Sequence, residues 1–305
     1  MRVFVFRFPL RVALVILTAT LSVGHSQEGA RKGESASIEQ SWSQEKNYLR
    51  PYLINTPKGA KDHPLPVIIF LHGNGGNAKS LQGMVHRRYP KVVSQFITVF
   101  PEGYQKSWNI VSERSKADDR GFIEAIVQEL AKRDDVQKEG FTIMGNSNGA
   151  ALVNQIAIET KLPQIKNFIS SVSPLNGLQH DGKNFKAKGE NNDYQVTATP
   201  LMGKRFLNVS GTSDPLVPYR GGRSRAIPGK DGKLSFVDAE ESIFLWAKQM
   251  GYKGAKLERA LEVSGKIEIF SYLDGDVVHF KVNDHGHNAT QALTDQLLLK
   301  FLEQK

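Results

Sequence analysis

One serine in the chain has the neighbours that a nucleophilic serine needs. Ser147 is the centre of GNSNG, after the apolar run 141–144 and before a segment of helical character. A nucleophile at a sharp strand-to-helix turn takes a strained backbone conformation, and side chains two residues before or after it would collide with the adjoining elements. Gly145 and Gly149 meet that requirement. Because Gly-x-Ser-x-Gly alone recurs by chance, the pattern is a hypothesis that needs its partners.

A serine hydroxyl is a weak nucleophile, so the hypothesis requires a histidine base and a carboxylate that orients it, with the acid earlier in the chain than the base. Asp214 follows the buried run 206–209, and His285 and His287 precede the last helical segment. We predict Asp214 as the acid and favour His287 over His285 as the base.

Other readings of these residues stay open. Asp214 could simply cap the turn that Pro215 and Pro218 shape, as Asp often does. The fallback acids are Asp276 and Asp284. The two histidines could be metal ligands, but neither a cysteine nor a helical His-x-x-x-His pattern supports that.

A glycine-rich loop follows a second buried strand. In the stretch VIIFLHGNGGNAKS a buried strand leads into His72 and the loop 73–76, which would let a backbone N–H approach an oxyanion. The first amides of the helix after Ser147, including that of Asn148, would point to the same place. A phosphate-binding loop is the alternative, but its G-x-x-x-x-G-K-[ST] spacing is absent. We expect His72 to organise this loop rather than to transfer protons.

The elements that must position these residues alternate along the chain. Short apolar runs alternate with segments of helical period, which predicts an α/β fold with a mostly parallel central sheet and helices on both faces. Helices are expected after Asp118 and Asp119, over 239–250 before Gly251, and around 289–302. Strands are expected at 48–54, 67–71, 97–100, 141–144, 168–172, 206–209, 267–272 and 277–282.

The organisation of the chain follows from composition. Residues 1–26 read as a signal peptide, with a basic flank, a short apolar run and small residues at a cleavage site. Residues 27–47 are expected to be a flexible lead-in, and 48–305 a single domain with a small insertion, a candidate lid, near 178–198. No later segment is typical of a membrane span.

Two compositional facts limit the function. The chain contains no cysteine, which excludes disulfides and thiolate metal sites. The formal charge is +9, and the basic residues are spread along the chain rather than gathered in a nucleic-acid-binding run, so the surplus would favour acidic polymers or cell walls.

Six motifs together resemble a known group of enzymes. LHGNGG, PEGYQKSWN, DDRGFIEAIVQEL, GNSNGAAL, GTSDPLVPYRGG and the pair Gly286-His287 are similar in order and spacing to the α/β-hydrolase group of polyhydroxybutyrate depolymerase-like and feruloyl or acetylxylan esterase-like enzymes. The resemblance implies Ser147 as nucleophile, Asp214 as acid and His287 as base, with the backbone amides of Asn74 and Asn148 as the oxyanion hole. The chain differs in lacking disulfides and in having NATQAL where many relatives have Trp-Pro-Gly.

We therefore expect a secreted or periplasmic serine esterase, a carboxylic ester hydrolase of class EC 3.1.1. It would act through an acyl-enzyme on feruloyl or acetyl esters of polysaccharide, with Tyr104, Trp108 and Tyr219 as candidate pocket residues. A polyhydroxybutyrate depolymerase, a peptidase of the same fold and a catalytically inactive carbohydrate-binding relative are the alternatives. No cofactor, metal, nucleic-acid partner or stable membrane insertion is expected, and the chain is expected to be a monomer.

Overall fold

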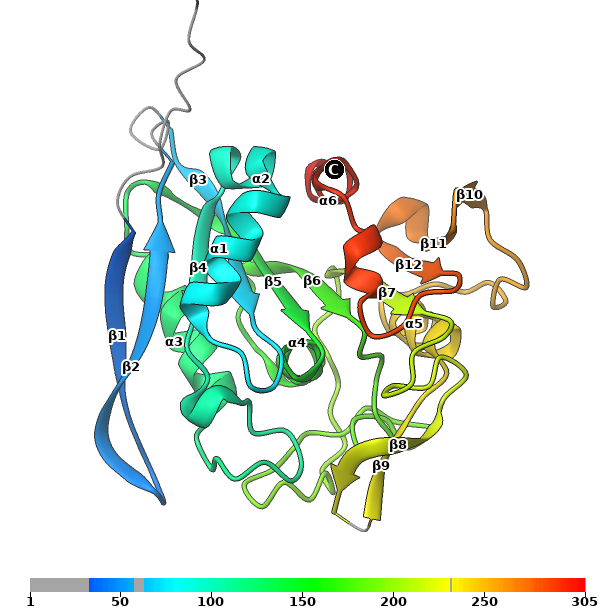
Figure 1. The fold of residues 1–305 in the computed structure, drawn as a ribbon, viewed down its shortest axis with the longest axis horizontal. Coiled ribbons are helices and arrows are strands. Elements are labelled where there is room, and N and C mark those ends of the chain that lie inside the picture. The colour runs from blue at the N-terminus through cyan, green and yellow to red at the C-terminus, as the bar shows by residue number, and fades with distance from the viewer. Residues whose placement is uncertain (1–32, 58–62, 231, 305) are drawn as a thin grey trace, which may run out of the picture.

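A ten-stranded sheet forms the centre of the molecule in the computed structural model, which describes residues 33–57, 63–230 and 232–304. The strand order is β1-β2-β4-β3-β5-β6-β7-β12-β11-β10, and the stretch from β4 to β12 is parallel (Figure 1). Antiparallel strands extend the sheet at both edges. The strands are β1 (Glu34–Trp42), β2 (Glu45–Asn55), β3 (Leu65–Leu71), β4 (Ile97–Pro101), β5 (Val136–Asn146), β6 (Ile165–Ser171), β7 (Arg205–Gly211), β10 (Glu262–Ser264), β11 (Ile267–Tyr272) and β12 (Val277–Val282).

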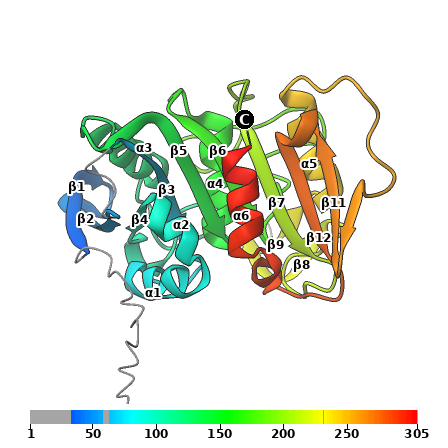
Figure 2. The same ribbon diagram turned by 90° about the horizontal axis from the view of Figure 1, so that it is seen from above.

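Helices cover both faces of this sheet, as Figure 2 shows from above. One face carries α1 (Ala78–Arg88), α2 (Pro90–Gln95) and α6 (Asp295–Glu303); the other carries α3 (Asp119–Leu130), α4 (Asn148–Glu159) and α5 (Ala239–Gln249). Short 3₁₀ turns are η2 (Tyr104–Lys106), η3 (Leu273–Gly275) and η4 (Ala289–Ala292).

Alternation along β3 shows how one strand serves two cores. Val67, Ile69 and Leu71 pack into the cluster with α3, α4 and α5, whereas Ile68 and Phe70 pack into the cluster with α1, α2 and α6. Successive side chains of a strand point to opposite faces, so a strand that is covered on both sides reads as a continuous apolar run. The predicted α/β class with a mostly parallel sheet is confirmed.

The predicted elements coincide with eight strands and with helical segments of the structure. Asp118 caps α3 by accepting a hydrogen bond from the Gly121 amide, and Gly251, at φ 102°, follows the end of α5. The last predicted helix is divided into η4 and α6. Helices α1 and α2, the short edge strand β10 and the separate hairpin of β8 (Gly222–Gly229) and β9 (Gly232–Phe236) were not predicted.

The predicted flexible lead-in over 27–47 is wrong for its described part. Strand β1 pairs antiparallel with β2 from Glu34 to Trp42. Its side chains alternate between exposed and half-buried, so its polar composition is that of an edge strand facing water. Buried Arg50 of β2 ties this hairpin to α3, because its guanidinium lies 2.6 Å from the Asp119 carboxylate. The predicted signal peptide lies outside the described residues.

The insertion expected near 178–198 connects β6 to β7 without long elements of its own. Isolated bridges pair His180 with Phe185 and Lys186 with Thr197. The segment is anchored to the loop after β4, because the buried Tyr194 hydroxyl donates to the Ile110 carbonyl. Within the described part of the chain, no helix has both the length and the apolar character that a bilayer crossing requires.

Candidate active site

Ser147 lies in the tight turn between β5 and α4, at the carboxyl end of the parallel strands. Its backbone has φ 54° and ψ −118°, a conformation that non-glycine residues rarely adopt. Its amide donates to the Ser171 carbonyl of the neighbouring strand at 2.9 Å. The strained turn predicted from the sequence is therefore present, and it lifts the hydroxyl above the sheet edge.

The two glycines around Ser147 are required by close backbone contacts. A Cβ on Gly145 would lie 2.4 Å from the carbonyl of Gly149. A Cβ on Gly149 would lie 2.6 Å from the carbonyl oxygens of Leu71 and His72. Neither distance is possible for carbon, so β5, α4 and the end of β3 can meet only around glycines.

Three side chains from distant segments form one hydrogen-bonded chain. Ser147 Oγ lies 2.8 Å from His287 Nε2, and His287 Nδ1 lies 2.7 Å from Asp214 Oδ2. An ionised carboxylate only accepts, so Nδ1 carries the proton and Nε2 accepts from the serine hydroxyl. Asp214 follows β7 and His287 follows β12, two strands that pair in parallel and so deliver both residues to the same edge.

The other carboxylate oxygen of Asp214 has a structural role. Oδ1 accepts from the amides of Leu216 at 2.8 Å and Val217 at 3.0 Å, and the side chain is only 3% exposed. Both readings of Asp214 from the sequence, turn cap and partner of the histidine, describe the same carboxylate. The turn bonds fix the oxygen that faces His287.

The remaining candidate acids and the second histidine take no part in the hydrogen bonds that join Ser147, His287 and Asp214. His285 Nδ1 contacts the Asn283 carbonyl at 2.9 Å, and the His285 carbonyl accepts from the Ser213 amide. Asp276 pairs with Arg205 at the other end of β12, and exposed Asp284 pairs with Lys266. Their geometry leaves Asp214 and His287 as the pair that faces Ser147.

The glycine loop after β3 lies directly beside the serine. A Cβ built on Gly73 would lie 3.6 Å from that of Ser147. The amides of Gly75 and Gly76 are bonded to the carbonyls of Lys106 and Gly73, so they are occupied inside the loop. Asn148 is the first residue of α4, and an amide at that position has no acceptor within its own helix. This geometry suits the predicted oxyanion hole of Asn74 and Asn148.

The Asn148 side chain holds the next loop in place. Its Oδ1 accepts from the Trp108 amide at 2.8 Å, and its Nδ2 donates to the Trp108 carbonyl and to Glu113 Oε1, each at 3.0 Å. Glu113 also accepts from the amides of Ile110 and Val111. Sequence reasoning missed Glu113, because an acidic residue in a polar loop carries no motif.

Two further residues near the turn were missed as well. The Thr290 hydroxyl donates to Asn146 Oδ1 at 2.7 Å, which links the histidine loop to the serine turn. Val172 follows Ser171 with φ 52°, a strained value for a β-branched residue. Nothing in the local sequence signals the Thr290 hydrogen bond or the strained backbone of Val172.

His72 organises the glycine loop, as expected. Its Nε2 accepts from the Gly103 amide at 3.0 Å, so Nδ1 carries the proton and donates to the Gly73 carbonyl at 2.8 Å. Burial lowers the pKa of His72, which keeps the ring neutral and both bonds intact.

The three predicted pocket aromatics do not line a pocket together. Trp108 is fully buried, and its indole N–H donates to the His72 carbonyl at 2.8 Å. Buried Tyr219 contacts Glu240 and His279 through its hydroxyl. Tyr104 lies against the β1–β2 hairpin, edge-to-face with Trp42, and its hydroxyl donates to Glu45. Trp108 and Tyr219 thus point into the protein, and Tyr104 is half-exposed beside the hairpin.

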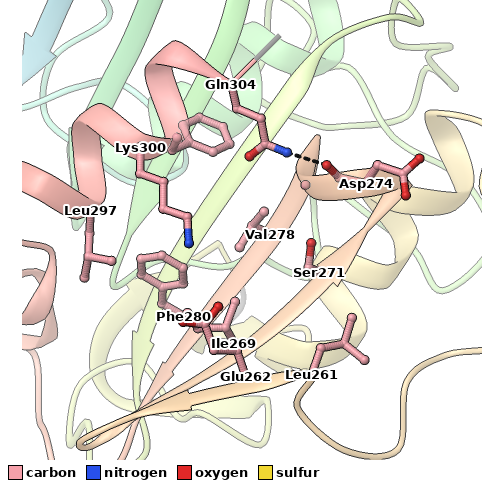
Figure 3. Close-up of a pocket in the computed structure, with 12 residues that line it drawn as sticks. Leu261, Glu262, Ile269, Ser271, Asp274, Val278, Phe280, Leu297, Lys300 and Gln304 are labelled. Carbon is pink, nitrogen blue, oxygen red and sulfur yellow. Dashed lines mark hydrogen bonds between the residues drawn. The ribbon is translucent and has the colours of Figure 1, made fainter.

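A separate cavity lies between α6 and the strands β11 and β12, as Figure 3 shows. Its volume is about 240 Å³, and its lining includes Ile269, Phe280 and Phe301 but none of Ser147, Asp214 and His287. Among the described residues, no group of three or more His, Cys, Asp and Glu is arranged to hold a metal ion.

The sequence is similar to that of known esterases and thioesterases. The sequence model of the palmitoyl protein thioesterase family matches residues 66–209. Feruloyl esterase B of Piromyces equi is 24% identical over 214 residues, which are 67% of this chain and 36% of that protein. The chain thus spans about a third of the length of this relative.

Solved structures share the fold at low sequence identity. The acetyl xylan esterase from Aspergillus awamori matches with a TM-score of 0.56 at 12% identity, over 84% of this chain and 94% of its own. The carboxylesterase from Bacillus cereus matches with a TM-score of 0.51 at 15% identity, over 83% of this chain and 93% of its own.

Proposed function

We propose that this chain, which has the α/β-hydrolase fold, is a serine esterase that cleaves carboxylic esters through an acyl-enzyme. The observation that carries the proposal is the hydrogen-bonded chain from Ser147 through His287 to Asp214. It is supported by the strained serine turn and by the names of the similar proteins, which are esterases.

In the first half-reaction Ser147 Oγ attacks the ester carbonyl carbon while its proton passes to His287 Nε2. Asp214 stabilises the imidazolium through Nδ1–H and stays ionised. The oxyanion lies against the backbone amides of Asn74 and Asn148. When the tetrahedral intermediate collapses, the C–O bond to the alcohol breaks and the alcohol oxygen takes the proton from Nε2.

In the second half-reaction a water molecule attacks the acyl carbon and gives a proton to Nε2. Collapse of this second intermediate releases the acid and returns that proton to Ser147 Oγ. Besides the substrate and this water molecule, the steps use the side chains of Ser147, His287 and Asp214 and the two backbone amides.

Feruloyl or acetyl esters of polysaccharide are the proposed substrates. Support comes from a feruloyl esterase among the relatives and an acetyl xylan esterase among the structural neighbours. Export is proposed with it, because the amino-terminal sequence reads as a signal peptide and polysaccharide substrates lie outside cells.

The match to the palmitoyl protein thioesterase family favours one second candidate, a thioesterase. A thioester carbonyl would react with Ser147 by the same steps, with a thiol in place of the alcohol as leaving group.

The test measures acid release by the purified mature protein and by Ser147→Ala. The substrates are p-nitrophenyl acetate and butyrate, methyl ferulate, acetylated xylan, short-chain polyhydroxybutyrate and a palmitoyl thioester. Activity that disappears in Ser147→Ala supports the mechanism, and the preferred substrate decides between ester and thioester. A folded wild-type protein that is inactive on the whole panel and is not labelled by a fluorophosphonate would overturn the proposal in favour of a non-catalytic relative.

A further inference from the structure

The β8–β9 hairpin carries a concentration of positive charge beside the candidate active site. Its sequence GRSRAIPGKDGKLSF contains four cations, Arg223, Arg225, Lys230 and Lys233, against one acidic residue. All four cationic side chains are exposed. In Figure 1 the hairpin projects from the same end of the molecule at which the central strands β5 and β6 end.

Hydrogen bonds fix the hairpin to the loops that surround Ser147. Ser224 Oγ donates to the Leu216 carbonyl at 2.6 Å, two residues from Asp214. The Val237 amide donates to the Leu175 carbonyl and the Gly177 amide to the Ser235 carbonyl, which anchors β9 to the loop after β6. The hairpin is therefore held against the loops that follow β6 and β7.

A third anchor completes this attachment. Ser112 Oγ donates to the Pro228 carbonyl at 3.2 Å, so the hairpin also touches the loop that holds Asn148. That loop carries two more exposed cations, Arg114 and Lys116. Positive side chains thus occur on two adjoining segments at the edge of the candidate site.

The side chains of the hairpin are sorted by charge. Ser224, Leu234 and Phe236 are buried toward the body of the protein, and Arg223 and Arg225 project into water. Arg223 and Arg225 are two residues apart in β8, so both exposed guanidinium groups belong to one short segment. A guanidinium binds a carboxylate through two parallel hydrogen bonds.

The composition of the hairpin narrows the class of partner. Single-stranded nucleic acids bind through stacking on aromatic side chains, but the one aromatic residue of this hairpin, Phe236, is buried. Insertion into a lipid surface uses exposed large apolar residues beside the cations, but Leu234 is buried and Ile227 is half-buried. A hydrophilic anionic polymer fits the surface better.

We propose that the β8–β9 hairpin is a docking surface for polysaccharide that carries uronic acid carboxylates, and that it selects esters on acidic chains. The inference rests on the proposed esterase function for its catalytic part. It assigns the substrate as an ester-bearing polymer in which carboxylates near the ester contact Arg223, Arg225 and Lys230.

The binding test uses Ser147→Ala, which cannot turn over the polymer by the proposed mechanism. Affinity for acetylated glucuronoxylan is measured with this protein and with one that also carries Arg223→Gln, Arg225→Gln and Lys230→Gln. We expect the triple change to raise the dissociation constant about tenfold at low salt, and salt to weaken binding by the unchanged hairpin.

A matched control removes the same charge elsewhere. The control protein carries Lys132→Gln, Lys138→Gln and Lys166→Gln. These lysines lie around the amino-terminal ends of β5 and β6, whereas Ser147 follows the carboxyl end of β5. These changes should leave the dissociation constant within about twofold. Equal weakening by both triple variants would reduce the effect to net charge and overturn the proposal, as would tighter binding to duplex DNA or a sulfated glycan than to glucuronoxylan.

The kinetic test compares active protein on acetylated glucuronoxylan and on the same xylan after enzymatic removal of glucuronic acid. The hairpin variant should raise KM on the acidic polymer about tenfold and leave kcat/KM for p-nitrophenyl acetate unchanged. Equal KM values of the wild-type protein on both polymers overturn the docking surface. If the wild-type protein binds the acidic polymer but hydrolyses none of the substrates, the esterase function is overturned and the docking surface is supported.

Discussion

Asp214 and His287 are joined at 2.7 Å through one carboxylate oxygen, while the other oxygen of Asp214 holds the turn amides of Leu216 and Val217. One side chain therefore sets both the shape of its own loop and the orientation of the imidazole. The two roles can be separated by substitution, because an amide keeps one oxygen but loses the charge.

Asp214→Asn should retain the turn bonds through its amide oxygen and lose its acceptor toward His287. We expect kcat to fall about 10³- to 10⁴-fold, since the histidine loses its correct tautomer and the stabilisation of its charged form. The melting temperature should change little. Asp214→Ala should lose both roles, with a similar kcat and a clearly lower melting temperature. Equal melting temperatures of the two variants would contradict the dual role.

The two histidines of the last loop should differ sharply. His287→Ala removes the group that faces Ser147 Oγ, and kcat should fall about 10⁴-fold or more. His285→Ala removes only a side chain that contacts the Asn283 carbonyl, and kcat/KM should stay within about threefold. Steady-state kinetics on p-nitrophenyl acetate measures both. A larger loss in His285→Ala than in His287→Ala would refute the assignment of the base.

Two glycines near the serine offer a matched comparison. In Gly149→Ala the new methyl would meet backbone oxygens at 2.6 Å, so the free energy of unfolding should fall by about 3 kcal/mol. In Gly73→Ala the nearest atoms are 3.5 Å away or more, so stability should be nearly unchanged. The Gly73→Ala methyl faces Ser147, however, and should lower kcat/KM. Urea denaturation and kinetics on the same preparations check both effects.

Buried His279 should make stability depend on pH. It contacts Asn208 Oδ1 and the Tyr219 hydroxyl, each at 2.9 Å. Burial, together with the nearby charge of Lys281, lowers its pKa to about 3. Below the ordinary pKa of 6.5 the unfolded chain binds a proton that the folded chain does not, so stability falls as pH drops from about 6.5 toward 3.

The expected slope from this one group is about 1.4 kcal/mol per pH unit in that range. Urea denaturation between pH 7 and 5 measures it for the wild-type protein and for His279→Gln. The variant should lose that part of the slope even if it is less stable at pH 7. Parallel curves for the two proteins would exclude a neutral buried His279.

The sequence predicted the parts of the fold that obey a local rule. The buried parallel strands are continuous apolar runs, and α3 and α5 have the capping residues that mark a helix. Strand β1 has no such signal, because an edge strand that faces water has the composition of a flexible segment. The β8–β9 hairpin is similar, since its pairing depends on the loops around it.

The site divides in the same way. Ser147 and its two glycines could be predicted because the backbone geometry of the turn restricts residue types. Trp108 and Tyr219 were expected to line a pocket and are buried instead. The sequence could not show this, because tertiary packing sets the direction of a loop side chain. Glu113 holds Asn148 through contacts that depend only on the folded loop.

The bond between Ser147 and His287 spans 140 residues of chain. During synthesis Ser147 is made long before His287, and we expect the two to meet only when β12 pairs with β7. During refolding, loop closure over such a distance is slow and depends on the sheet, so catalysis should return with the last pairing events rather than with early collapse. We therefore expect a chain that ends before β12 to have no esterase activity.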